Sequence, residues 1–279
     1  MRNLAGIYSC RQVLRRPICC IYHIEGWNNP MYLRTQGLVL RVTNYNDADA
    51  MLSVLTKEYG MLSVKARGLR RKNSPLIAPC QLLAYGDFTL FEYKGMYTIN
   101  EAYSVELFTG LRKDLQKLSL GSYFAQLAET VSQEDLPNPE LLSLVLNCLY
   151  ALSNLPVPEN LIKAAFELRT ACIAGYYPDL SGCNRCGNTI PDRFDISEGH
   201  LECELCRNLD SSGIRMPITP GVLDAMRYIC GCDGKQLLSF TASNDTLELL
   251  SQVTESYIST QLERGFSALD FYKSLLIPM

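Results

Sequence analysis

The sequence predicts an α+β protein in which a small N-terminal β-barrel is followed by an α-helical domain that carries a four-cysteine insert. Strand-like runs and tight turns fill residues 31–108, with almost no helical pattern between them. A helical period begins after the barrel and holds over most of residues 109–279. Two Cys-x-x-Cys pairs interrupt this helical part within residues 181–207. We therefore expect two domains, with a metal-binding or disulfide-bonded segment inside the second.

Five short strands account for the barrel. TQGLVLRVTNY reads as one strand, and AMLSVLTKEYGMLSVKARG reads as two strands because Glu58-Tyr59-Gly60 makes a tight turn between them. LLAYGDFTLFEYKGMYTINEAYSVE gives two more strands, which turn at Lys94-Gly95. Five strands within one short stretch of chain are typical of a barrel of the OB type, a fold that often binds oligonucleotides.

Helical segments follow the barrel. Apolar side chains spaced for one face of a helix open this part of the chain: Leu111, Leu115, Leu118, Tyr123 and Leu127. Prolines in the first helical turn predict three further helices, which start at Asn138-Pro139, Pro158-Glu159 and Thr219-Pro220. Apolar periodicity predicts two later helices, over residues 243–264 and 268–276. The helical domain is therefore expected to surround the cysteine segment on both sides.

Residues 1–30 show neither helical nor strand periodicity, so we expect a poorly ordered N-terminal extension. Their apolar patch PICCIYHI is short and no small-residue cleavage site follows it, which argues against a secretory signal. No apolar run in the chain reaches the length of a transmembrane helix. We therefore expect a cytoplasmic protein, whose thiols stay reduced. The strand pattern begins at Met31, which makes Met31 a candidate for the natural start.

Four cysteines have the spacing of a zinc site. Cys183 and Cys186 form one pair, Cys203 and Cys206 form the other, and 16 residues separate the pairs. A Cys-x-x-Cys turn presents two thiolates to one ion, and two such turns complete the tetrahedral four-thiolate set that Zn²⁺ prefers. RFDISEGHLEC reads as a strand, a turn at Glu198-Gly199 and a second strand, which brings the pairs together. We expect one structural Zn²⁺ ion at this site.

Other chemistry for these cysteines finds less support. A thioredoxin-like redox pair stands in a βαβ unit, and neither pair is surrounded by one. A zinc deaminase needs a His-x-Glu motif together with a Pro-Cys-x-x-Cys motif. His200-Leu201-Glu202 has the first spacing, but neither cysteine pair is preceded by a proline. His200 could replace one cysteine as a ligand, but a polar residue of the hairpin is the simpler interpretation. The remaining cysteines that lie among apolar residues or at a helix end are interpreted as packing residues: Cys80, Cys148, Cys172, Cys230 and Cys232.

Charge and aromatic residues in the barrel point to nucleic acid. Residues 1–72 contain 12 Lys and Arg against 4 Asp and Glu, whereas the rest of the chain contains 14 against 25. The segment KARGLRRK contributes five cations without an acid: Lys65, Arg67, Arg70, Arg71 and Lys72. Aromatic residues follow it closely: Tyr85, Phe88, Phe91, Tyr93, Tyr97 and Tyr103. Cations that track phosphates and rings that stack on bases are the two components of single-strand binding. A solvated charge run beside core aromatic residues is the alternative.

The whole layout resembles the RecO family of bacterial DNA repair and recombination mediators. The resemblance covers about residues 33–276. It rests on GLVLRVTNYNDADAMLSVLTKEYGMLSVKARGLRRKNSP in the barrel, on AAFELRTACIAGYYPDLSGCNRCG before the cysteine site, and on YISTQLERGFSALDFYKSLL at the end. The family has an OB-fold front domain and a helical back domain, and many of its members carry the zinc segment.

The resemblance implies a DNA-binding protein without catalytic residues. Such a protein binds single- and double-stranded DNA, anneals complementary strands, and acts at the nucleoid in the cytoplasm. With its partner RecR it helps RecA to load onto gaps coated by single-stranded DNA-binding protein (SSB), whose acidic C-terminal tail it contacts. Carried over to this sequence, the DNA-binding positions are Arg41 and the five cations of residues 65–72, and the zinc ligands are the four cysteines.

Three other functions are compatible with parts of the sequence. A zinc-ribbon factor could use the OB barrel on RNA, which differs from DNA in its A-form geometry and 2′-hydroxyl groups. A metalloenzyme would need an open coordination position, which a complete set of four thiolates does not leave. A purely structural scaffold would not need its basic loop for DNA binding.

Overall fold

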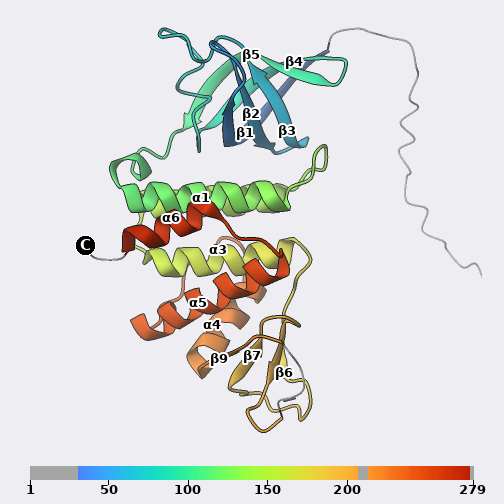
Figure 1. Cartoon of the computed structure of the whole chain (residues 1–279), viewed down its shortest axis with the longest axis vertical. Helices are drawn as coiled ribbons and strands as arrows, with labels where there is room; N and C mark the ends of the chain where they lie inside the picture. Colours follow the sequence, from blue (N-terminus) through green and yellow to red (C-terminus); the bar gives the residue numbers. More distant parts are fainter. Residues whose placement is uncertain (1–30, 207–212, 277–279) are drawn as a thin grey trace, which may run out of the picture.

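The computed structural model describes residues 31–206 and 213–276. A β-barrel, a layer of helices and a small β-sheet follow one another along the longest axis of the molecule (Figure 1). The expected N-terminal extension, residues 1–30, lies outside the described residues. The observed order of barrel, helices, cysteine segment and helices is the one that the sequence predicts.

The barrel closes in the strand order β1-β2-β3-β5-β4, with each neighbour hydrogen-bonded to the next. All pairs are antiparallel except β3 with β5, which is parallel. This is the connectivity of the predicted OB type. The strands are β1 (Met31–Asn44), β2 (Ala50–Thr56), β3 (Gly60–Ala66), β4 (Tyr85–Tyr93) and β5 (Met96–Glu106).

Both predicted turns are present. Gly60 ends the turn between β2 and β3 with a φ of 67°, a left-handed conformation that glycine adopts without steric cost. A Cβ atom at Gly60 would lie 2.4 Å from the carbonyl oxygen of Leu136, in the loop between two helices. The turn therefore serves two purposes, because it joins two strands and lets the barrel approach the helical domain closely.

Six α-helices are present in the second part of the chain, as far as the structure describes it: α1 (Leu115–Val131), α2 (Pro139–Asn154), α3 (Glu159–Ile173), α4 (Pro220–Gly231), α5 (Asn244–Gln261) and α6 (Ser267–Leu276). Helix α1 starts later than the sequence predicts. Leu111 belongs to a short 3-10 turn, and Asp114 caps α1 by accepting hydrogen bonds from the backbone N–H groups of Gln116 and Lys117. Leu115, predicted on the buried face, is 56% exposed. Among the described residues, no helix combines the length and apolar character needed to cross a membrane.

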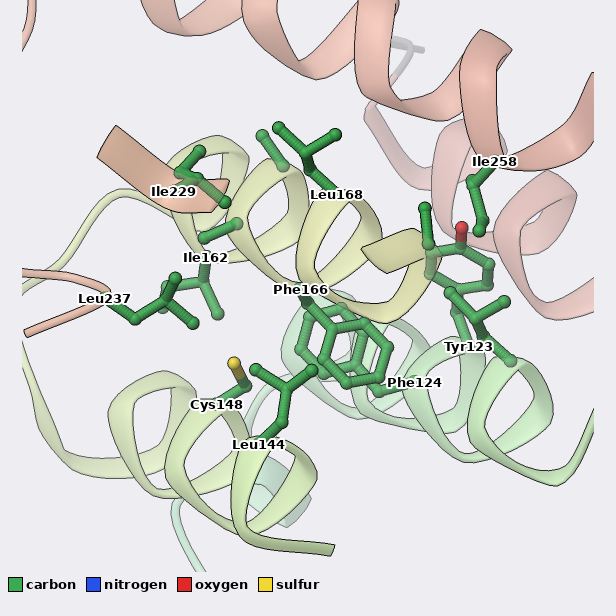
Figure 2. Close-up of a cluster of buried hydrophobic side chains, with 14 of the residues drawn as sticks. Tyr123, Phe124, Leu144, Cys148, Ile162, Phe166, Leu168, Ile229, Leu237 and Ile258 are labelled. Carbon is green, nitrogen blue, oxygen red and sulfur yellow. The ribbon is translucent and has the colours of Figure 1, made fainter. Parts of the chain in front are cut away.

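Helix α3 lies at the centre of the helical domain. Nearly all of its residues between Leu161 and Ala171 are buried. Phe166 packs on Phe124 of α1 with ring centroids 4.2 Å apart, and aliphatic side chains of α2, α4 and α5 surround them (Figure 2). Aromatic pairs of this kind stabilise a core beyond the area that they bury.

The same helix buries an ion pair. Lys163 Nζ lies 2.9 Å from Glu167 Oε1, and the two residues are 3% and 0% exposed. Glu167 also accepts hydrogen bonds from Tyr123 (2.9 Å) and Thr254 (2.7 Å), which fix α1 and α5 against α3. Burial raises the pKa of the Glu167 carboxyl, while Lys163 and the two hydroxyl groups oppose the rise. The charge is therefore tolerated only because its partners surround it.

The barrel and the helices share one core. Leu38, Leu40, Leu55 and Leu83 of the barrel belong to the buried cluster that α1 contributes to, whereas the barrel interior forms a second cluster. A Cβ atom at Gly121 of α1 would lie only 3.0 Å from Leu83, so the glycine allows this close approach. Continuous apolar packing therefore fixes the barrel on α1, the helix that lies next to it in Figure 1.

The buried pair gives a prediction about stability. Lys163→Met leaves the Glu167 carboxylate without its nearest cation, and we expect a loss of about 3 to 5 kcal/mol in the free energy of unfolding. Lys163→Met/Glu167→Gln is expected to recover part of that loss, because the neutral amide still bonds Tyr123 and Thr254 while Glu255 loses Lys163 and keeps only Lys273. Urea denaturation of the three proteins measures both effects. Equal stability of the wild type and Lys163→Met would contradict this account.

Candidate nucleic-acid interface and metal centre

The basic segment KARGLRRK leaves the end of β3 and enters a long surface loop. Three apolar side chains of this loop, Leu69, Leu76 and Cys80, are buried in the barrel core. Gly68 has a φ of 68°, and the Arg71 N–H bonds the Gly68 carbonyl at 3.1 Å, so the chain turns sharply there. The loop is thus anchored, while its basic side chains remain at the surface.

A second turn holds the basic loop in place. The carboxylate of Asp49 accepts a hydrogen bond from the Gly68 N–H (2.9 Å), and the Arg70 N–H bonds the Ala48 carbonyl (3.0 Å). The Arg70 guanidinium donates to the Asn46 carbonyl at 2.7 Å. The Gly68 N–H, followed by Asn46 and Lys65, lowers the pKa of the Asp49 carboxyl. Residues 45–49, the clasp turn, therefore fix the beginning of the loop.

Five of the six predicted DNA-binding cations gather at this loop. Arg67, Arg70, Arg71 and Lys72 are exposed, and Lys65 reaches the same region from the end of β3. Lys65 Nζ lies 3.3 Å from the Asp49 carboxylate, which offsets part of its charge. The cluster remains strongly basic, because five cations face two acids of the clasp turn, Asp47 and Asp49.

The sixth cation, Arg41, is placed differently. It lies on the outer face of β1, opposite Ser53 of β2, and its side chain is 62% exposed. Its Nε donates to Glu129 of α1 at 2.9 Å, so the guanidinium forms an ion pair across the boundary between barrel and helices. The sequence offered no sign of this partner, which is 88 residues away. Glu129 therefore offsets part of the charge of Arg41.

The predicted aromatic residues divide between core and surface. Phe88 is buried in the barrel, whereas Tyr93 and Tyr103 are 42% and 63% exposed. The structure adds an aromatic residue that the sequence reasoning did not single out: Tyr45, which is 63% exposed at the start of the clasp turn. Its signal in the sequence was weak, because it precedes the basic segment by 20 residues and only strand pairing brings the two together.

The four predicted cysteines come together. Their sulfur atoms all lie within 4.8 Å of one another, and Cys186 Sγ is 3.8 Å from Cys203 Sγ. The hairpin of β7 (Arg193–Asp195) and β8 (His200–Glu202) pairs antiparallel, as predicted, and β6 (Asp179–Cys183) joins β8. The other described cysteines lie outside this set, with Cys172 Sγ 3.7 Å from Cys230 Sγ.

The geometry fits a tetrahedral metal ion. Four thiolate sulfurs at about 2.3 Å from a central Zn²⁺ are separated by about 3.8 Å, which the Cys186–Cys203 distance equals. Burial raises the pKa of the Cys183 thiol, but backbone N–H groups of residues 185, 186 and 203 outweigh it and hold the pKa at about 6. Asn188 Nδ2 donates to Cys203 Sγ at 3.3 Å, an outer contact of the kind that orients metal ligands.

The cysteine segment is tied to the helical domain. Arg227 of α4 donates to the carbonyls of Leu180 and Thr189, both at 2.9 Å. Gln261 of α5 donates to the carbonyl of Ile196, and Phe194 packs edge-on against Tyr257 of the same helix. The segment lies at the end of the molecule opposite to the barrel (Figure 1). The cysteine cluster and the basic loop are therefore separate sites.

A second cluster of possible metal ligands lies on the hairpin itself. Asp195, His200 and Glu202 lie close enough together to bind a cation. The guanidinium of Arg215, in β9 (Arg215–Pro217), already supplies a cation there: its Nε lies 2.8 Å from Glu202 and its Nη2 lies 3.4 Å from Asp195. Burial raises the pKa of Glu202, but Arg215 and His200 outweigh it and lower the pKa overall. We interpret this group as a buried ion-pair network that stabilises the hairpin.

Comparison with known proteins assigns both domains to one family. The profile of the family "Recombination protein O N terminal" matches residues 31–108, and that of "Recombination protein O C terminal" matches residues 112–270. The two matches cover the barrel and the helical domain with its cysteine segment.

Curated relatives lead to the same family. The "DNA repair protein RecO" of Acetivibrio thermocellus is 35% identical over 88% of this chain and 97% of its own length. The protein of the same name from Alkaliphilus metalliredigens is 32% identical over 88% of this chain and over its own whole length. The one from Bacillus subtilis is 28% identical over 81% of this chain and 88% of its own length. The chain belongs to the RecO family of DNA repair proteins, which are non-enzymatic recombination mediators.

Proposed function

We propose that this chain binds single- and double-stranded DNA through the basic loop of its barrel and anneals complementary strands. The observation that carries the proposal is the anchored loop itself. Arg67, Arg70, Arg71 and Lys72 are exposed, while buried Leu69 and the clasp turn fix the backbone beneath them. A charge run that served only for solubility would need no such anchoring.

The mechanism follows from electrostatics. Each phosphate that a cation neutralises releases condensed counterions, so binding gains entropy and weakens as salt concentration rises. Contacts to the phosphates carry little sequence information, which suits a protein that acts wherever DNA is damaged. Two strands whose phosphates are partly neutralised repel each other less, so they pair faster without a catalytic residue.

The further steps rest on the family to which the chain belongs. We propose that, with RecR, the protein helps RecA to load onto gaps coated by SSB, and that it contacts the acidic tail of SSB. We expect this activity at the nucleoid, in the cytoplasm. The uneven distribution of charge supports the proposal, because the basic part of the barrel can hold DNA while other surfaces remain for protein partners.

We also propose that the four cysteines hold one structural Zn²⁺ ion. All four ligands would be thiolates from Cys183, Cys186, Cys203 and Cys206, which leaves no position for a reactive water molecule. The sheet around the site is small, since β7, β8 and β9 have three residues each. Such short strands bury little area of their own, so an ion that joins two turns would stabilise the segment substantially.

The DNA proposal predicts a specific salt dependence. Arg67→Ala/Arg70→Ala/Arg71→Ala is expected to weaken binding of a labelled single-stranded oligonucleotide. The slope of log K against log salt should become shallower by up to about 2, since each lost phosphate contact contributes about 0.7. Fluorescence anisotropy over a salt series measures both quantities.

A charge-matched variant serves as the comparison. Lys57→Ala/Lys113→Ala/Lys235→Ala removes three exposed cations that lie outside the basic loop, and we expect wild-type affinity and slope from it. If both triple variants reduce the slope equally, only net charge matters and the loop is not the binding surface. Competition between DNA and RNA of one sequence tests the nucleic acid: a clear preference for RNA would overturn the proposal.

The zinc proposal predicts the metal content. Purified protein should contain one zinc ion per chain, and X-ray absorption should show four sulfur neighbours at about 2.3 Å. Cys203→Ser should lose the ion and lower the thermal midpoint, because the segment loses its cross-link. Cys232→Ser, a half-buried cysteine outside the cluster, should keep the ion. Wild-type DNA affinity is expected for both variants, since the site lies at the far end from the barrel (Figure 1). Full metal content in Cys203→Ser would refute the ligand set.

A further inference from the structure

We propose that Tyr45 is a base-stacking platform of this protein, where the ring of one nucleobase of single-stranded DNA rests. The inference rests on the proposed DNA-binding function and assigns to it a residue that contacts bases rather than phosphates. Its starting observation is the exposure of the tyrosine: 63% of a large aromatic side chain faces solvent. A residue that served the core alone would be buried, as Phe88 is at 1%.

The backbone around Tyr45 is held rigidly. The Tyr45 N–H donates to the Asp49 carbonyl at 3.1 Å and closes the clasp turn. Within the turn, Asn46 Oδ1 accepts from the N–H groups of Ala48 (3.0 Å) and Asp49 (2.7 Å). The Arg70 guanidinium donates a further hydrogen bond to the Asn46 carbonyl from the basic loop. A platform held in this way loses little conformational freedom when a base stacks on it, which favours binding.

A cation already stands at the ring. Lys65 Nζ lies 4.7 Å from the centroid of the Tyr45 ring, within the range of a cation–π interaction. Lys65 is itself fixed by the Asp49 carboxylate, so the ammonium group and the ring form one unit. Because Lys65 covers one face of the ring, a base would stack on the opposite face.

The surrounding charges suit a nucleotide. Through its contact with Asn46, Arg70 stands one residue from the tyrosine, and Arg67, Arg71 and Lys72 continue along the same loop. Phosphates of the neighbouring nucleotides can bind these cations while one base rests on the ring. Every base has a flat aromatic face, so such a contact adds affinity without sequence preference.

Another exposed tyrosine shows what is special about this position. Tyr103 on β5 is also 63% exposed, but its hydroxyl lies 3.4 Å from the carboxylate of Glu101 and it pairs across the sheet with Asp87. Phosphates are repelled by acidic neighbours of this kind. Tyr103 therefore provides a control of equal exposure that lies beside two acidic residues, whereas Tyr45 lies beside Lys65 as well as Asp49.

Two ligands separate stacking from phosphate binding. Anisotropy would compare a labelled oligothymidylate with an oligonucleotide of equal length whose sugars carry no bases. Tyr45→Leu is expected to bind oligothymidylate about 5- to 150-fold more weakly than the wild type, which corresponds to the loss of one stacked base. On the abasic ligand the two proteins should bind equally, and the salt slope should stay unchanged. Tyr45→Phe and Tyr103→Leu should bind both ligands as the wild type does.

The outcomes distinguish this inference from the proposed function. Unchanged binding of oligothymidylate by Tyr45→Leu would overturn the platform and leave DNA binding by the loop intact. Equal weakening on both ligands would also overturn it, because the tyrosine would then act only by positioning the cations. If the wild type binds neither ligand, the proposed DNA-binding function fails and the platform fails with it.

Discussion

The structure depends on the burial of one charged pair in helix α3. Lys163 and Glu167 lie on the helix against which α1, α2, α4 and α5 pack, and hydroxyl groups of Tyr123 and Thr254 complete the hydrogen bonds of the carboxylate. Because a buried charge is stable only with its partners in place, the pair fixes α1 and α5 relative to α3. The barrel rests on α1 and the cysteine segment on α4 and α5, so the positions of both ends of the molecule depend on this centre.

This arrangement separates two kinds of chemistry. At one end, an anchored loop and a clasp turn hold five cations and an exposed tyrosine on a closed barrel. At the other end, two cysteine turns meet beside a sheet whose short strands bury little area of their own. The helices between them keep the sites apart (Figure 1). A family of mediators without catalytic residues needs surfaces rather than a cleft, and a layer of helices with a site at each end provides them.

Much of this could be predicted because the signals are local. Turns at residues 58–60 and 94–95 define the barrel strands, and the spacing of Cys183, Cys186, Cys203 and Cys206 brings the four sulfurs into one cluster. The start of α1 could not be predicted from periodicity. Asp114 offers its side chain to two free N–H groups, and that cap outweighs the apolar pattern that included Leu111.

The sequence by itself determined the strands, the helices, the cysteine cluster and the basic loop, because turn residues, helix caps and cysteine spacing act over a few positions. Only the tertiary structure decided the rest. Arg41 forms an ion pair with Glu129 across the domain boundary, and Tyr45 meets Lys65 and the loop through strand pairing. Those contacts join residues that lie 20 or more positions apart. Their formation depends on how the barrel closes and where it rests on α1, which no local pattern records.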